Sequence, residues 1–215
     1  PSTAGVQRSL FSINTGGVIL MKIFISILLM MFFTYNQVFA IAPLNEQSIT
    51  AAQKYGIDNS KINLGLFLKP WLSYEETSSK LDETAETAHI YTSYLLIATD
   101  AKEATLKNKK VTLQDSEKVI IDYNDILSFS IKVSGENDIF AQNLVAIIVQ
   151  GDNVVKSVKI IPQAVSYNEK NKKYSAGSFV YFKESSIELG KPIKLIISTS
   201  DNNKHCFYFD LAKIN

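Results

Sequence analysis

The second half of the chain consists of short strand-like segments separated by residues that favour turns. Residues 127–133 (LSFSIKV) alternate apolar and polar side chains, which is typical of a strand with one buried face. Residues 144–149 (LVAIIV) are continuously apolar, as in a central strand, and Gly151-Asp152 predicts a hairpin turn into a strand over 154–161. The same reasoning predicts strands over 179–182, 193–197 and 205–211.

Residues 41–125, which precede these strands, contain helix-start signals. Asn45 is expected to cap a helix over 46–55, and Gly56 is the type of residue that follows a helix end. Thr112 and Asp115 form a capping-box pattern in front of an amphipathic segment, so a second helix is predicted there.

Two other segments of the first part read as extended chain. Residues 64–68 are apolar and end before Pro70, and residues 89–98 are rich in aromatic and β-branched side chains, which favour strands. A short helix is predicted over 99–106. Because roughly 10–15-residue helices do not separate the later strands, a parallel sheet is disfavoured. The strand-rich C-terminal half resembles immunoglobulin-like domains, and the expected fold is mainly β: an antiparallel immunoglobulin-like β-sandwich of about seven strands, with short helices in the N-terminal half.

Residues 21–40 have the pattern of a secretory signal peptide. Lys22 precedes an apolar run over 23–33, and the sequence Val38-Phe39-Ala40 predicts cleavage after Ala40. The run is about half the length that a membrane-spanning helix needs, although a tethered protein with an uncleaved signal is the alternative. We interpret residues 1–20 as an upstream leader or added sequence outside the fold, and residues 41–215 as a single β-sandwich domain with helical decorations.

The charge of the body differs from that of the whole chain. Removing Arg8 and Lys22 from the 22 basic residues leaves 20 against 21 acidic ones, so residues 41–215 carry a net charge of −1. Because binding to phosphate backbones needs a basic excess, a nucleic-acid partner is not expected. Arg8 is the only arginine, and heavy use of Lys, Ile and Asn is typical of an AT-rich bacterial genome.

The compartment follows from the signal peptide and the single cysteine. Cys206 has no second cysteine with which to form an intrachain disulfide. We therefore expect a secreted or periplasmic bacterial protein that is stabilised by its core alone and is not inserted in a membrane after signal cleavage.

Catalytic motifs are sparse. The two histidines are His89 and His205, and strand parity places His205 on the apolar side with Phe207, whereas Cys206 points to the other face. Adjacent strand residues therefore cannot act together as nucleophile and base, and a pairing of Cys206 with His89 has no support in the sequence. No zinc-ligand spacing or nucleotide-binding loop occurs, so neither a metal nor a cofactor is expected.

Two kinds of polar segment have ordinary structural explanations. Residues 74–88 are acidic and threonine-rich but lack the spacing of a calcium loop, so a solvated loop is expected. Two lysine clusters, at 107–110 and 170–173, are predicted to be basic loop tips.

An aromatic group supplies the candidate partner-binding site. Trp71 follows Pro70, and Tyr74, Tyr91 and Tyr94 are near it in the sequence. Trp71 could be an exposed anchor for a protein or a sugar ring, or a plug over the end of the core.

Two functions remain from the sequence. The first is an exported, non-catalytic binding or interaction module whose partner is a protein or glycan of the bacterial cell envelope or secretome. The alternative is an exported hydrolase that uses carboxylates brought together by the fold.

Overall fold

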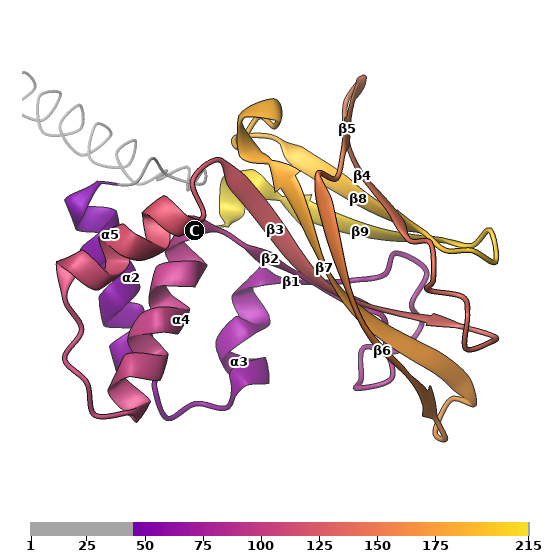
Figure 1. Cartoon of the computed structure of the whole chain (residues 1–215), viewed down its shortest axis with the longest axis horizontal. Coiled ribbons are helices and arrows are strands. Elements are labelled where there is room, and N and C mark those ends of the chain that lie inside the picture. Colours follow the sequence, from indigo (N-terminus) through magenta and orange to yellow (C-terminus); the bar gives the residue numbers. More distant parts are fainter. Residues whose placement is uncertain (1–44, 215) are drawn as a thin grey trace, which may run out of the picture. The chain divides into compact units, whose positions relative to one another are not determined.

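The computed structural model describes residues 45–214, which form four α-helices and two antiparallel sheets (Figure 1). The expected leader, the signal peptide and the cleavage after Ala40 lie outside the described residues. The described helices are α2 (Glu46–Asp58), α3 (Leu64–Leu68), α4 (Ser93–Leu106) and α5 (Leu113–Asp122), with 3₁₀ turns η1 (Lys69–Trp71), η2 (Glu184–Ser186) and η3 (Leu211–Lys213). The described strands are β1 (Leu72–Tyr74), β2 (Thr87–Tyr91), β3 (Ile126–Gly135), β4 (Val145–Gln150), β5 (Asn153–Lys156), β6 (Lys159–Asn168), β7 (Lys173–Lys183), β8 (Pro192–Ser198) and β9 (Lys204–Asp210).

The strand order confirms the immunoglobulin-like sandwich. One sheet has the order β1-β2-β3-β7-β6 and the other β5-β4-β8-β9, and all their pairings are antiparallel. With β2 as strand A and β9 as strand G, these orders are A-B-E-D and C′-C-F-G, the arrangement of immunoglobulin domains. β1 is an additional strand beside A.

The core lies between the two sheets, where alternate residues of each strand point inward. The inward residues of β3 include Phe129, which is fully buried and packs against Phe209 of β9 and Phe182 of β7, with ring centroids 5.3 and 5.7 Å away. Leu195 in β8 is also fully buried, and helix residues such as Leu95 join the same cluster. Both sheets and the helices thus share one apolar core.

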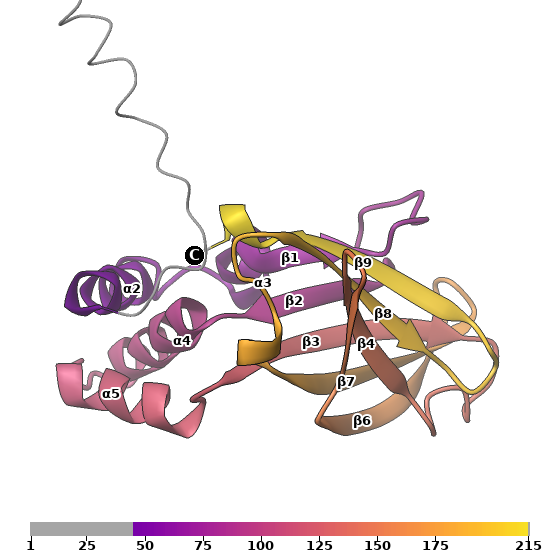
Figure 2. The same ribbon diagram turned by 90° about the horizontal axis from the view of Figure 1, so that it is seen from above.

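The helices α4 and α5 are inserted between strands A and B of the sandwich, and they lie beside α2 in both views (Figures 1 and 2). Gly56 lies inside α2, not past its end as predicted. A Cβ at this position would be 2.1 Å from the carbonyl oxygen of Ala98 and 2.9 Å from Ala101 Cβ. Close packing of α2 on α4 therefore explains this glycine.

Two segments predicted as extended are helical. Residues 64–68 form α3, since the Asn63 side chain accepts a hydrogen bond from Leu66 N at 3.0 Å. The predicted strand over 89–98 ends at Tyr91, and α4 starts at Ser93, because the Thr92 side chain accepts from Leu95 N. A local cap thus outweighed the strand propensity of aromatic and β-branched residues.

The C-terminal predictions hold with changes at the ends. The hairpin at Gly151 is present, with Gln150 paired to Asn153 and a φ of +58° at the glycine. The single strand predicted over 154–161 is two strands, since β5 ends at Lys156 and β6 joins the other sheet. Among residues 45–214, no helix has the length and hydrophobicity required to cross a membrane.

Candidate functional site

Trp71 belongs to a buried aromatic cluster. Its side chain is 3% exposed, stacks on Tyr94 at 6.2 Å and meets the edge of Tyr55 at 5.6 Å. Tyr55 also contacts Phe67, at 5.2 Å between ring centroids. Of the two interpretations of Trp71, the plug over the end of the core fits this arrangement.

The other two predicted aromatics lie on the outer face of the first sheet. Tyr91 alternates with the buried Ile90 in β2, and both Tyr91 and Tyr74 are half-buried. The structure thus brings Trp71 and Tyr94 together, and it places Tyr74 and Tyr91 on the neighbouring sheet surface. Burial raises the pKa of both Tyr91 and Tyr94.

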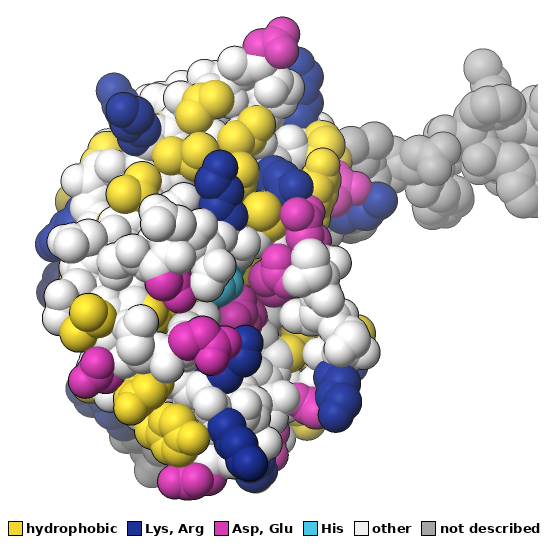
Figure 3. Space-filling model, turned by 90° about the vertical axis from the view of Figure 1, so that its right-hand side faces the viewer, with side chains coloured by type: hydrophobic (Ala, Val, Ile, Leu, Met, Phe, Trp, Pro, Cys, Tyr) yellow, Lys and Arg dark blue, Asp and Glu magenta, His cyan; other side chains and the backbone are white. Residues whose placement is uncertain are grey.

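A polar cleft lies at the end of the sandwich where the B–C, D–E and F–G connections meet. Its volume is about 570 Å³, and Figure 3 shows a hollowed face with acidic side chains around a histidine. The B–C, D–E and F–G connections form three walls of the cleft. The fourth wall is the connection between β1 and β2, residues 75–86, which we name the strap. The described lining residues are Glu75, Thr77, Ser78, Ser79, Lys80, Thr84, Ala85, Glu86, Ser134, Gly135, Glu136, Asn171, Lys173, Asn203, Lys204 and His205.

The strap is attached to both sheets. Glu75 forms an antiparallel bridge with Phe207 of β9, and Glu76 N donates to the Cys206 carbonyl at 2.9 Å. At its other end, Lys132 Nζ donates to the Glu83 carbonyl at 2.6 Å. The strap therefore closes the sandwich between β1 and β9 and holds one wall of the cleft in place.

Short turns explain why an acidic, threonine-rich sequence adopts this path. Glu75 Oε2 accepts from the backbone N and the hydroxyl of Thr77, each at 2.7 Å. Asp82 Oδ1 accepts in the same way from Thr84, at 2.8 and 2.6 Å, which lowers the pKa of Asp82. These side chains replace the missing backbone partners of an irregular segment.

His205 and Glu86 form the base of the cleft. The imidazole Nδ1 is 2.5 Å from Glu86 Oε2, and His205 is only 7% exposed. The other oxygen, Oε1, accepts from Ser134 N at 3.0 Å. Because an ionised carboxylate has only acceptors, Nδ1 carries the hydrogen and donates it. This carboxylate connects β9, the start of β2 and the end of β3.

The second ring nitrogen of His205 differs from the first. Nε2 is buried and has no hydrogen-bond partner within residues 45–214. Strand parity predicted the inward position of His205 correctly. Its partner Glu86 was missed, since it is 119 residues away in the sequence. The available signal was a carboxylate three residues before the predicted strand over 89–98.

Most acidic groups of the cleft already have protein partners. Glu136 forms an ion pair with Lys173 at 3.1 Å, and Glu75 is held by Thr77. In the described part of the chain, neither Lys80 nor Lys204 has a carboxylate within ion-pair distance. The lining thus contains three glutamates and three lysines, and Lys80 and Lys204 are its two lysines without an ion pair among residues 45–214.

Cys206 lies on the other face of β9 from His205, as parity predicted. It is 9% exposed, and burial raises the pKa of its thiol, with the nearby Glu76 carboxylate adding to the effect. A protonated thiol is a poor nucleophile. Cys206 faces outward from the second sheet and His89 outward from the first, so the core separates them.

A second cavity, of about 360 Å³, contains a carboxylate pair. It is lined by Asp125 before β3 and Glu184 in η2, together with Tyr123 from the end of α5. Burial raises the pKa of Glu184, and the neighbouring Asp125 raises it further. Ser185 N, which donates to Asp125 at 2.7 Å, lowers the pKa of Asp125. The surroundings thus favour the protonated form of Glu184 and the ionised form of Asp125.

No family model and no curated protein matches this sequence. Among solved structures, the chain is similar to one described as "IgNAR antibody domain C1". The similarity covers 47% of this chain and 84% of that one, at 11% identity and a TM-score of 0.29.

Proposed function

We propose that this protein is an exported bacterial binding module that holds a polar, acidic ligand in the cleft at the end of its sandwich. The observation that carries this proposal is the location of Lys80 and Lys204. Both line a cleft of about 570 Å³, and within residues 45–214 neither is in an ion pair. A ligand carboxylate or other acidic group would form ion pairs with these two lysines.

The architecture supports binding at this end. Immunoglobulin-like variable domains bind ligands with loops that include B–C and F–G. Here the same end carries a cleft whose base is fixed by Glu86 and His205 and whose wall is fixed by the strap. A preformed site of this kind loses little conformational entropy on binding. An acidic glycan or a protein carboxylate of the cell envelope would pair with Lys80 and Lys204.

The interactions that the cleft glutamates already form within the protein favour binding over hydrolysis in this cleft. Glu75 accepts from Thr77, Glu86 accepts from His205 and Ser134, and Glu136 pairs with Lys173. Because general acid–base catalysis needs a carboxyl group that reaches the substrate, side chains already bonded within the protein suit it poorly.

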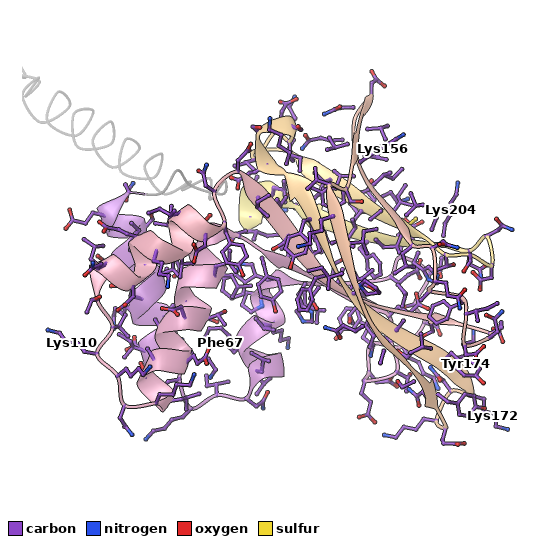
Figure 4. All side chains as sticks on the ribbon, viewed as in Figure 1. Phe67, Lys110, Lys156, Lys172, Tyr174 and Lys204 are labelled. Atoms are coloured by element: carbon purple, nitrogen blue, oxygen red, sulfur yellow. The ribbon has the colours of Figure 1, made fainter. Side chains whose placement is uncertain are left out.

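Site-specific photo-crosslinking on native cell envelopes tests this proposal. A photoreactive residue is placed at Ser79, an exposed residue that lines the cleft, and, as a control, at Lys156, an exposed lysine on β5 (Figure 4). We expect a discrete crosslinked species from position 79 that is absent from position 156. Equal crosslinking from both positions, or none from position 79, would contradict the proposal.

A second candidate function rests on Glu184 and Asp125. Their pKa values move in opposite directions in one cavity, which is the arrangement that separates an acid from a base in glycoside hydrolases. If the protein hydrolyses chromogenic glycosides, Glu184→Gln removes that activity, whereas Glu83→Gln on the strap leaves it unchanged. The absence of hydrolysis by the unmodified protein would eliminate this candidate.

A further inference from the structure

An exposed apolar surface lies at the C-terminal ends of α2 and α4, apart from the cleft residues. Ile62, Leu64 and Leu66 in and before α3 are 41%, 56% and 59% exposed, whereas the next residue, Phe67, is fully buried. We name this surface the apolar tip; it consists of Ile57, Ile62, Leu64, Leu66 and Leu106.

The backbone of the apolar tip is satisfied from inside the protein. Lys102 in α4 is buried, and its Nζ donates to three carbonyl oxygens: those of Asn59 at 3.0 Å, Ser60 at 2.5 Å and Ile62 at 2.7 Å. Asn63 caps the following helix. Because Lys102 already bonds these three carbonyl groups, the turn can move from water into an apolar phase without leaving them unsatisfied.

The end of α4 extends the same surface. Leu106 is 59% exposed and follows Lys102 by one helical turn, so both side chains are on the same side of α4. Since Lys102 contacts residues 59–62, Leu106 is beside that turn. Apolar side chains from two separate segments thus form one surface.

Lysines surround the apolar tip. They are Lys54, Lys61, Lys69, Lys107, Lys109 and Lys110, and all are exposed. Lys107, Lys109 and Lys110 line a hollow together with Lys118 and four acidic residues, Asp100, Glu103, Asp115 and Asp122, so the charges of that hollow balance. Lys54 is paired with Asp58 at 2.6 Å. The basic excess of the region therefore comes from Lys61 and Lys69, which are in no ion pair among residues 45–214, although the body as a whole is slightly acidic.

We propose that the apolar tip docks this protein on an anionic lipid surface. The isoleucine and leucine side chains enter the boundary between headgroups and acyl chains, and the lysines lie at the level of the phosphates. Apolar burial and attraction to anionic lipid act together in such contacts. The tip thus positions the protein at a membrane surface, independently of what the cleft binds.

An environment-sensitive fluorophore tests the contact directly. It is attached to Leu64→Cys in a Cys206→Ser background of the full chain, with Val154→Cys, an exposed apolar position of β5, as the matched control. On vesicles with about 30% phosphatidylglycerol in phosphatidylcholine, we expect a blue shift and a large intensity rise at position 64 alone. On pure phosphatidylcholine, the response at position 64 should need about tenfold more lipid. Equal responses at both positions, or none at position 64, would overturn the proposal.

A double variant separates lipid binding from the other possible occupants of the tip. Leu64→Ser with Leu66→Ser removes two exposed side chains and should lower vesicle affinity about tenfold or more, whereas Val154→Ser with Val158→Ser should not. Thermal unfolding of both variants checks that they are folded. If the leucine variant instead abolishes self-association in sedimentation and leaves vesicle binding intact, the occupant is a second copy and the lipid proposal is wrong.

Discussion

His205 Nδ1 lies 2.5 Å from Glu86 Oε2, and this contact connects the two sheets at the base of the cleft. Glu86 also accepts from Ser134 N, so one carboxylate serves three segments that are distant in the sequence. The cleft therefore has a base whose geometry depends on a buried polar group, while its exposed lysines remain available to a ligand.

Removing the Glu86 carboxylate should destabilise the fold. In Glu86→Ala, the His205 imidazole and Ser134 N lose their acceptor while buried, which costs about 2–4 kcal/mol in the free energy of unfolding. Urea denaturation measures this change. Glu83→Ala is the control in the same strap, since that side chain is 72% exposed and pairs with the exposed Lys170. Its effect should stay below about 0.5 kcal/mol. Equal losses in the two variants would contradict the role of Glu86.

His89 should make stability depend on pH. Burial lowers the pKa of His89 from 6.5, and the positive charge of Lys132 lowers it further. The unfolded chain therefore binds a proton at a higher pH than the folded one. The contribution of neutral His89 to the free energy of unfolding is complete above pH 6.5. It is lost as the pH falls through the lower pKa of the folded state.

The comparison of the wild type with His89→Gln isolates this effect. The free energy of unfolding of the wild type, measured from pH 8 downward, should fall more steeply below pH 6.5 than that of His89→Gln. Parallel curves would show that His89 does not contribute.

Lys102 should stabilise the turn between α2 and α3. Lys102→Met keeps most of the apolar stem but removes the donor to three carbonyl groups, which should cost about 2–3 kcal/mol. Lys54→Met is the control, because Lys54 is exposed and has one ion pair with Asp58. Chemical denaturation compares the two, and a loss from Lys54→Met as large as that from Lys102→Met would contradict the prediction.

Two glycines in helices should respond oppositely to alanine. In α2, Gly56→Ala places a Cβ 2.1 Å from Ala98 O, so the helices must separate and the thermal midpoint should fall. In α3, the nearest atom to a Cβ at Gly65 is Asn63 Oδ1 at 3.7 Å. Gly65→Ala should therefore gain up to about 1 kcal/mol of helix propensity. A raised midpoint for Gly56→Ala would show that α2 and α4 do not pack closely.

The sequence was informative where local pattern and tertiary structure agree. Strand parity placed His205 inward and Cys206 outward, because the period of two is a property of the strand itself. The strand propensity of residues 93–98 predicted a strand where the structure has a helix, since one hydrogen bond to Thr92 starts α4 among residues that favour strands. Glu86 could not be paired with His205 in advance, because the strand order alone brings them together.

The most direct test of the binding function is amide shift mapping in the isotope-labelled protein during titration with solubilised cell-envelope fragments. We predict that the largest shifts occur at Ser78, Glu136, Asn171 and Asn203, one from each connection that lines the cleft. The amides of β5 should stay unchanged. Shifts confined to Asn124 and Ser185 at the second cavity, or to no cleft residue, would contradict it.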